Sequence, residues 1–415
     1  MKLKLDQGIA GAVHDFVLEK SAAAEQARTF PSDPFWKGLQ ATGTRLWLDT
    51  GDIDAAARQW TREFSALTTN NTLLNKEVQK GIYDAVIKEA GGLLGARLGD
   101  QRVLEIAFIL NALHGLRLVK VFGARVSVEL HTAIADDVEA AVAYGRRFAR
   151  VSPSHFIVKV PLTAAGLLAT RILRREGIPV NFTLGFSARQ NYLAARFAAP
   201  TYVNVFLGRL NAYMTDNALG DGLLVGEKAT LASQAGVARA SKGAKEPTLQ
   251  IAASMRGGSQ VRDLAGVDVM TMPLATAAEA HAGLDGKWQS KVREVYRVSL
   301  AAGVEETALR LSTLWDITDR DESLAGSLVD QEPSTAQELV DRAHALGSGD
   351  LFPRLGDADI QVIASDGKIP KQARWSERIA RGELAIDTLC TIAGLQSFTA
   401  DQRALDDRIR RLIAV

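Results

Sequence analysis

Lys159 has the side chain with the clearest potential for covalent chemistry, because it stands inside an apolar run. It lies in His155-Phe156-Ile157-Val158-Lys159-Val160-Pro161, a pattern typical of a strand buried in a parallel sheet. Moving an ammonium group out of water is costly unless the amine gives up its proton. A desolvated lysine is therefore a candidate nucleophile. The alternative is an edge-strand lysine whose charged end reaches solvent.

Further polar side chains stand where other short apolar runs end. Side chains alternate along a strand, so Ser127 and Glu129 share one face of the run Val126-Ser127-Val128-Glu129. The remaining members of this set, in chain order, are Asp49, Asn70, Asn181, Thr183, Asn204, Phe206, Arg209, Ser254 and Arg256. Carboxylates can move protons, amides and hydroxyls can bind substrate hydroxyls or a catalytic water, and two arginines can hold a phosphate.

Together with Lys159, this set predicts chemistry at a carbonyl carbon. An amine can condense with a ketone to form an iminium, whose positive charge draws electrons from a breaking carbon–carbon bond. Asp49 and Glu129 are the candidates for transferring the protons.

Each of these residues also has a structural alternative. Asp49 can be part of a turn, and Asn70 can cap a helix. Glu129 can pair with an arginine such as Arg125 or Arg45. The two arginines of the set can be surface cations. These alternatives weaken together, because all would have to coincide at the same end of successive strands.

The elements that position these residues follow from the hydrophobic pattern between about residues 45 and 275. Short β-branched runs predict strands at residues 45–48, 64–67, 126–129, 156–160, 180–183, 202–206, 249–252 and 269–271. Helix-like stretches such as residues 163–176 separate them. Eight such units predict a (β/α)8 barrel, whose active site forms at the carboxyl ends of the strands. An open doubly wound sheet is the alternative, but its Gly-x-Gly-x-x-Gly turn is missing.

The chain divides into two expected parts. Residues 1–275 form the barrel with leading helices in residues 1–40, and residues 276–415 form a helical extension packed on it. Within the extension, residues 347–368 are rich in Gly and Asp and predict a loop. Residues 399–402 have the spacing of a capping box, which predicts that a docked final helix begins there.

The composition bounds the class of protein. The chain has 415 residues, with 49 Lys plus Arg against 48 Asp plus Glu, so no bulk charge recruits nucleic acid or an anionic membrane. One cysteine, Cys390, excludes an internal disulfide and suits a reducing compartment. No stretch has the length of a membrane span or signal peptide, so we expect a cytoplasmic protein. The histidines lack the spacing of zinc ligands. His131, two residues after Glu129, is the one histidine that could lie near the site, but we expect it in an exposed loop instead.

These residues, in this order, resemble the transaldolase family of Schiff-base aldolases. The motifs that carry the resemblance are Leu46-Trp47-Leu48-Asp49-Thr50-Gly51-Asp52-Ile53, Leu67-Thr68-Thr69-Asn70, Val126-Ser127-Val128-Glu129, Val158-Lys159-Val160-Pro161, Val180-Asn181-Phe182-Thr183-Leu184 with Phe186-Ser187, Phe206-Leu207-Gly208-Arg209, and Ala252-Ala253-Ser254-Met255-Arg256. The resemblance covers about residues 45 to 275.

The resemblance implies an enzyme that cleaves a ketose phosphate such as sedoheptulose 7-phosphate or fructose 6-phosphate. It would pass a dihydroxyacetone unit to an aldose phosphate, with no metal or organic cofactor. Lys159 would carry the unit as a Schiff base, and Asp49 would be the acid and base of bond cleavage. Glu129 and Thr183 would organise the water of imine formation, and Asn70 and Asn181 would bind the dihydroxyacetone unit. Arg209 and Arg256 would bind the phosphate, and further substrate contacts would come from Asn204, Phe206 and Ser254.

The chain departs from the family pattern at three positions. Asn71 stands where proline is usual, Asn204 replaces a serine that helps to bind phosphate, and His131 replaces an acidic residue. Two other functions stay open. One is a fructose 6-phosphate aldolase that releases free dihydroxyacetone. Glu129 argues against it, because the pattern of such aldolases has a glutamine at this position. The other is a sugar-phosphate sensor without catalysis. A homo-oligomer is compatible with either.

Overall fold

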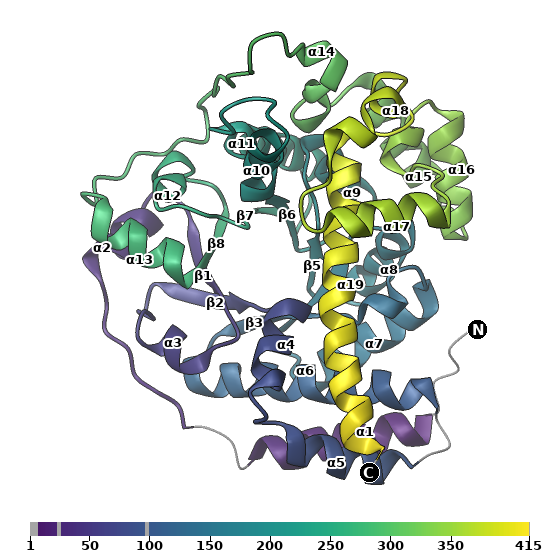
Figure 1. Cartoon of the computed structure of the whole chain (residues 1–415). Coiled ribbons are helices and arrows are strands. Elements are labelled where there is room, and N and C mark those ends of the chain that lie inside the picture. The colour runs from purple at the N-terminus through teal and green to yellow at the C-terminus, as the bar shows by residue number, and fades with distance from the viewer. Residues whose placement is uncertain (1–6, 23–25, 96–98, 415) are drawn as a thin grey trace.

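Eight parallel strands close into a barrel in the order of the chain (Figure 1). The structure is a computed structural model and describes residues 7–22, 26–95 and 99–414. The strands are β1 (Arg45–Asp49), β2 (Phe64–Thr68), β3 (Arg125–Glu129), β4 (Phe156–Pro161), β5 (Val180–Thr183), β6 (Tyr202–Phe206), β7 (Leu249–Ala253) and β8 (Val269–Pro273). All eight predicted strands are confirmed to within two residues at each end, and the barrel excludes the open sheet.

The register of the strands places the polar residues in one layer. Glu129 on β3 is level with Lys159 on β4, and Lys159 is level with Asn181 on β5. Below this layer the barrel is filled by aromatic rings, since Trp47 and Tyr202 meet edge to face with centroids 4.7 Å apart. Packed rings of this kind make the barrel a core and not a pore. The polar layer therefore sits on an apolar floor at the carboxyl end of the strands.

Helices surround the barrel and lead into it. They are α1 (Gln7–Ala22), α2 (Pro34–Gln40), α3 (Ile53–Ala57), α4 (Asn71–Gln79), α5 (Asp84–Leu94), α6 (Asp100–Phe122), η2 (Thr132–Ile134), α7 (Val138–Val151), α8 (Ala164–Arg175), α9 (Ala188–Phe197), α10 (Leu207–Asp216), α11 (Val225–Ala240), α12 (Ser259–Asp263) and α13 (Leu274–Gly283). Helix α8 confirms the predicted helix at residues 163–176. Thr163 caps it by accepting a hydrogen bond from the Gly166 N–H.

The chain after the barrel is largely helical, as predicted. It contains α14 (Glu306–Leu309), η3 (Leu311–Leu314), α15 (Asp319–Asp330), α16 (Ala336–Ala345), η4 (Gly349–Leu351), α17 (Asp357–Asp366), η5 (Gln372–Arg374), α18 (Ser376–Ala380) and α19 (Ile386–Ile413). The prediction of a loop at residues 347–368 was wrong, because η4 and α17 lie within it. The glycines there flank the helix: α17 begins after Gly356 and ends before Gly367, which has φ +76°.

The predicted start of the final helix was also wrong. Helix α19 begins at Ile386 and passes through residues 399–402 without a break. Gln402, which would complete a capping box with Thr399, instead donates a hydrogen bond to Asp406 on the same helix. Asp401, which stands between them, accepts a hydrogen bond from Thr72 on α4. Cys390 lies buried on the same helix.

Helix α19 crosses the carboxyl end of the barrel along one side. Figure 1 shows it running in front of the strands, from the neighbourhood of α9 to that of α5. Side-chain hydrogen bonds and ion pairs hold it to the barrel. In chain order they join Asp387 with Arg189 and Ser187, Thr391 with the Leu184 carbonyl, Asp401 with Thr72, Asp406 with His131, and Arg408 with Asp84. The extension therefore covers the ends of β2, β3 and β5.

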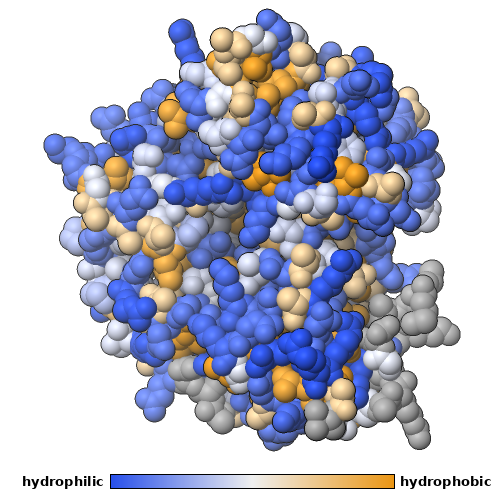
Figure 2. Space-filling view, in the orientation of Figure 1, coloured by the Kyte–Doolittle hydropathy of each residue, from blue (hydrophilic) through white to orange (hydrophobic). Residues whose placement is uncertain are grey.

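The face of the molecule seen in Figure 1 is mostly polar. Figure 2 shows it largely blue, with small, separate apolar patches. Among the helices described, none combines the length and the apolar character that crossing a membrane requires.

Candidate active site

Lys159 is buried inside the barrel, with 4% of its surface exposed. Its Nζ donates a hydrogen bond to the Thr69 carbonyl over 3.1 Å and lies 4.0 Å from Oε1 of Glu129. The side chain therefore does not reach solvent from a sheet edge. It stands in the polar layer, where a ligand atom placed above it would meet the amine.

Glu129 faces the lysine from the neighbouring strand. Its Oε2 accepts a hydrogen bond from the Asn71 N–H at 3.1 Å. Burial raises the pKa of the Glu129 carboxyl, and the charge of Lys159 offsets part of that rise. Glu129 is thus next to Lys159, and not paired with Arg125 or Arg45. A carboxyl that holds its proton more tightly than usual suits proton transfer near neutral pH.

Asp49 ends β1 on the other side of the layer. Its Oδ1 accepts a 2.6 Å hydrogen bond from Thr68 Oγ1, and that hydroxyl oxygen also lies 2.7 Å from Thr271 Oγ1. Burial raises the pKa of the Asp49 carboxyl, and Lys159 again offsets part of the rise. The turn cap that Asp49 might have formed is made by Asp52, which accepts from the Ala55 N–H at the start of α3. Asp49 is left directed at the site.

A row of amides crosses the barrel beside Lys159. Asn204 Nδ2 donates to Asn181 Oδ1, and Asn181 Nδ2 donates to Ser127 Oγ, both over 3.0 Å. Thr183 Oγ1 and Asn204 Oδ1 are buried and find no hydrogen-bond partner among the residues described. Since buried polar groups are nearly always satisfied, these two oxygens mark where a water or ligand atom would bind.

Asn70 combines a structural role with a place at the site. Its side chain accepts a hydrogen bond from the Leu73 N–H and so caps α4, as the structural alternative anticipated. The residue is half-buried, which leaves its amide nitrogen available to a ligand. Asn71 is buried, and within the described part of the chain its side-chain amide has no partner.

Arg209 is a buried cation. It is 6% exposed, and its guanidinium lies over the rings of Phe206 and Phe398, 5.3 and 5.5 Å from their centroids. Burial lowers the pKa of Arg209 to about 10, and its Nη1 has no hydrogen-bond partner in the described ranges. A buried guanidinium with an unused donor predicts that an anion binds there.

Arg256 is exposed and approaches the same region from the β7–α12 loop. Gln260 accepts a hydrogen bond from its N–H over 2.6 Å and holds the loop. A Cβ on Gly208 would lie 2.8 Å from Arg256 Cγ and 2.2 Å from the Ser254 carbonyl oxygen, so only glycine at this position leaves room for the loop and the Arg256 side chain. Ser254 is half-buried just past the end of β7, with φ +59°, a strained backbone for a residue with a side chain.

Sequence reasoning missed the residues that the extension adds to the site. Phe398 on α19 lies with its ring centroid 5.7 Å from Lys159 Nζ. Nothing in its local pattern distinguishes it from an ordinary helix residue that packs in a core. The expectation of an exposed His131 was wrong: its side chain is 12% exposed, and its Nε2 lies 3.2 Å from Asp406 Oδ1 on α19. Both differences arise because a segment far along the chain folds over the barrel.

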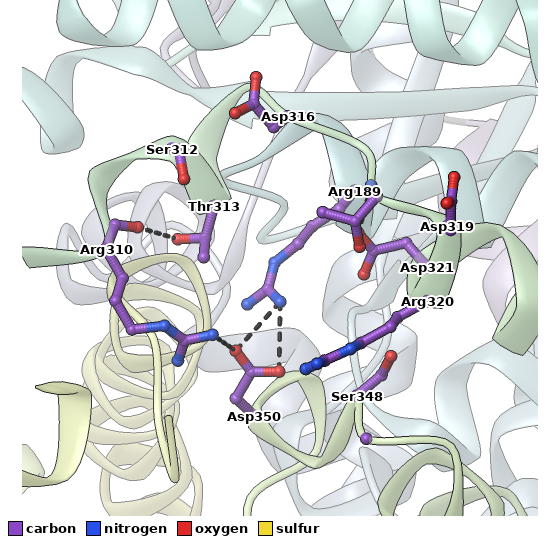
Figure 3. A pocket seen from close by; sticks show the side chains of 12 residues that line it. Arg189, Arg310, Ser312, Thr313, Asp316, Asp319, Arg320, Asp321, Ser348 and Asp350 are labelled. Carbon is purple, nitrogen blue, oxygen red and sulfur yellow. Dashed lines mark hydrogen bonds and ion pairs between the residues drawn. The ribbon is translucent and has the colours of Figure 1, made fainter. Parts of the chain in front are cut away.

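A separate polar cavity of about 390 Å3 lies between α9 and the extension (Figure 3). Figure 3 shows Arg189 and Arg310 both directed at Asp350, with which they form ion pairs. The other acidic residues around it are Asp316, Asp319 and Asp321. Arg320 also lines the cavity. Because Arg189 and Arg310 are already paired with Asp350 and the carboxylates outnumber the arginines, the cavity suits a sugar phosphate poorly. The described residues contain no group of His, Cys, Asp and Glu arranged to hold a metal ion.

Comparison with known proteins assigns the barrel to a family. The model of the Transaldolase/Fructose-6-phosphate aldolase family matches residues 46–314. A "Transaldolase" of Chlamydia muridarum is 30% identical over 241 residues, which are 55% of this chain and 72% of the relative. A "Probable transaldolase" of Thermus thermophilus is 35% identical over 235 residues, 55% of this chain and 87% of the relative. Phe398 and the rest of α19 lie beyond the residues that the family model matches.

Proposed function

Because the chain belongs to the transaldolase/fructose-6-phosphate aldolase family, we propose that it transfers a dihydroxyacetone unit from a ketose phosphate to an aldose phosphate. The observation that carries the proposal is the position of Lys159. It is a buried amine 4.0 Å from one carboxylate, in the polar layer of a barrel. Such an arrangement favours the condensation of an amine with a ketone.

In the proposed reaction, Lys159 Nζ attacks the C2 carbonyl carbon of the ketose and forms a carbinolamine. Glu129 would protonate the carbinolamine hydroxyl, which leaves as water to give the iminium, and Glu129 with Thr183 would bind that water. Support comes from the position of Glu129 beside the amine and from the unpartnered, buried hydroxyl of Thr183.

Asp49 is proposed to cleave the carbon–carbon bond. It removes the proton of the C4 hydroxyl, the C3–C4 electron pair moves into the iminium, and an aldose phosphate leaves. The enamine that remains on Lys159 then attacks the carbonyl carbon of the acceptor aldose, while Asp49 returns the proton to the new hydroxyl. The raised pKa of Asp49 suits it to hold that proton between the two half-reactions.

The remaining residues are proposed to bind the substrate. Asn70 and Asn181 would hold the hydroxyls of the dihydroxyacetone unit, and Asn204 would present its unpartnered Oδ1 to the sugar chain. Phe206 would form an apolar wall, and Ser254 would contribute at the end of β7. Arg209 and Arg256 would hold the phosphate, which supplies the anion that the buried guanidinium of Arg209 lacks.

A transfer assay tests the proposal. Purified protein is given fructose 6-phosphate with and without erythrose 4-phosphate, and sedoheptulose 7-phosphate and glyceraldehyde 3-phosphate are measured. We expect both products only with the acceptor, and Lys159→Met should abolish them. Release of free dihydroxyacetone at the same rate with and without the acceptor would instead show an aldolase. Binding of the sugar phosphates without any product would show a sensor.

A further inference from the structure

Phe398 covers the reacting end of Lys159. The ring is 3% exposed, its centroid is 5.7 Å from Lys159 Nζ and 5.5 Å from the Arg209 guanidinium carbon, and it meets Phe206 at 6.5 Å. One aromatic ring thus lies close to both the amine and the buried guanidinium. A carbon chain that joins an imine at Lys159 to a phosphate at Arg209 must pass along this ring.

The helix that carries Phe398 is fastened on both sides of it. On the N-terminal side, Thr391 donates to the Leu184 carbonyl at 2.8 Å, after the end of β5. On the C-terminal side, Asp401 bonds Thr72 and Asp406 lies 3.2 Å from His131. Close packing also fixes the helix, because a Cβ on Gly394 would lie 2.8 Å from Leu184 Cδ2 and 3.1 Å from Arg209 Nη1. Phe398 is therefore held in place as part of the wall of the site.

We propose that Phe398 is a specificity-determining residue that keeps water from the dihydroxyacetone unit on Lys159, so that the unit passes to an aldose phosphate and is not released. The inference rests on the function proposed above and extends it to a segment outside the family match. The inference follows from the geometry, because the ring occupies the side of the amine that faces α19. Without the ring, an imine at Lys159 would be open to solvent on that side. Exclusion of water is a general means of protecting a reactive intermediate.

Release and transfer differ in what reaches the enamine. For release, the enamine carbon takes up one proton to give the iminium, one water adds to C2, and the C2–N bond breaks to free dihydroxyacetone and the Lys159 amine. For transfer, the enamine carbon attacks the aldehyde instead of taking up a proton, and water then adds to C2 of the new iminium and the C2–N bond breaks to free the new ketose. Both routes therefore end in hydrolysis at C2, but only release needs a proton from solvent on the enamine carbon. An apolar ring over the amine slows that protonation and leaves the enamine to an acceptor that displaces water as it binds.

The first experiment measures the partition between the two routes. Wild type, Phe398→Ala, Phe398→Leu and Ile392→Ala receive fructose 6-phosphate, and dihydroxyacetone release without an acceptor is divided by transfer to erythrose 4-phosphate. Leucine retains an apolar cover, and Ile392 is a half-buried residue elsewhere on α19. We expect Phe398→Ala to raise the ratio about tenfold or more, equivalent to about 1.4 kcal/mol. The two other variants should stay near the wild type.

An unchanged ratio in Phe398→Ala, with release and transfer falling together, would overturn the inference and leave Phe398 a packing residue. So would an equal rise of the ratio in Ile392→Ala, because loosening α19 in general would then be the cause.

The second experiment tests the cover without any turnover. The folded proteins are treated briefly with acetic anhydride, a small neutral amine reagent, and acetylation of Lys159 is compared with that of exposed Lys76 by peptide mass spectrometry. Phe398→Ala should raise the ratio of Lys159 to Lys76 labelling, and Ile392→Ala should not. Equal labelling of both lysines in the wild type would contradict the cover. If the wild type transfers nothing, the proposed function is wrong, while this comparison still decides whether Phe398 shields the amine.

Discussion

Arg189 on α9 ties the extension to the barrel, and its removal should destabilise the protein strongly. The guanidinium is 4% exposed and makes two hydrogen bonds to Asp387, at 2.8 and 3.0 Å, at the start of α19. It makes two more to Asp350, at 3.1 and 3.2 Å, in the cavity of Figure 3. Arg189→Ala would leave both carboxylates without this cation.

The expected size follows from what each carboxylate retains. Asp350 keeps Arg310, whose Nη2 lies 2.9 Å away. Asp387 keeps the hydroxyl of Ser187 at 2.7 Å but loses its cation. Breaking a buried ion pair at one partner costs about 3–5 kcal/mol. Since one of the two carboxylates stays compensated, we expect about 3 kcal/mol, the lower end of that range.

Urea unfolding, followed by tryptophan fluorescence and by circular dichroism, measures this loss. The matched control is Arg239→Ala, which breaks an exposed pair with Glu322 whose side chains are 54% and 43% exposed. Such a pair contributes about 0–1 kcal/mol. Hydrogen exchange of residues 386–413 shows whether α19 loosens before the barrel unfolds. Equal losses in Arg189→Ala and Arg239→Ala would refute the reasoning that burial makes this pair essential to the docking of α19.

Three further substitutions test the site itself. Burial raises the pKa of Asp49 in the folded state, so ionising its carboxyl lowers the stability of the protein as the pH rises through that pKa. Asp49→Asn should therefore abolish transfer but raise the melting temperature at about pH 8. This gain in melting temperature should shrink toward about pH 4, where the carboxyl of the wild type is also uncharged. No pH dependence of the gain in calorimetry would argue against a raised pKa. Arg256→Ala should raise KM for phosphorylated ketoses about 10- to 100-fold and for unphosphorylated ones little, and equal effects would remove Arg256 from the phosphate site. Gly208→Ala should also raise KM, because its Cβ would meet the Ser254 carbonyl oxygen at 2.2 Å; unchanged kinetics would show that the loop yields without cost.

The barrel and the polar layer were predictable because both depend on local patterns. Strands of four to six residues separate helices with an apolar stripe, and that alternation sets the topology. The period of two along a strand then directs Glu129 and Lys159 inward, and the parallel register makes them neighbours. A residue-by-residue reading of strand ends could therefore find the side chains that share one face.

The part of the site made by α19 could not be predicted in this way. Phe398 reaches Lys159 through a fold that brings together residues more than two hundred positions apart, and no local period encodes such a contact. Residues 399–402 illustrate how local rules can mislead. Thr399 and Gln402 have the spacing of a helix start, but they lie in the middle of α19, where Asp401 holds the helix to Thr72 on α4. Tertiary contacts decided both cases.

The most direct test of the account is reductive trapping at Lys159. The protein is incubated with fructose 6-phosphate and sodium borohydride, digested, and analysed by peptide mass spectrometry, with Lys159→Met as the control. We expect a reduced adduct of the dihydroxyacetone unit or of the ketose on Lys159, and none in the control. An unmodified Lys159, or modification confined to exposed lysines such as Lys76, would contradict the central claim that this buried amine forms the Schiff base.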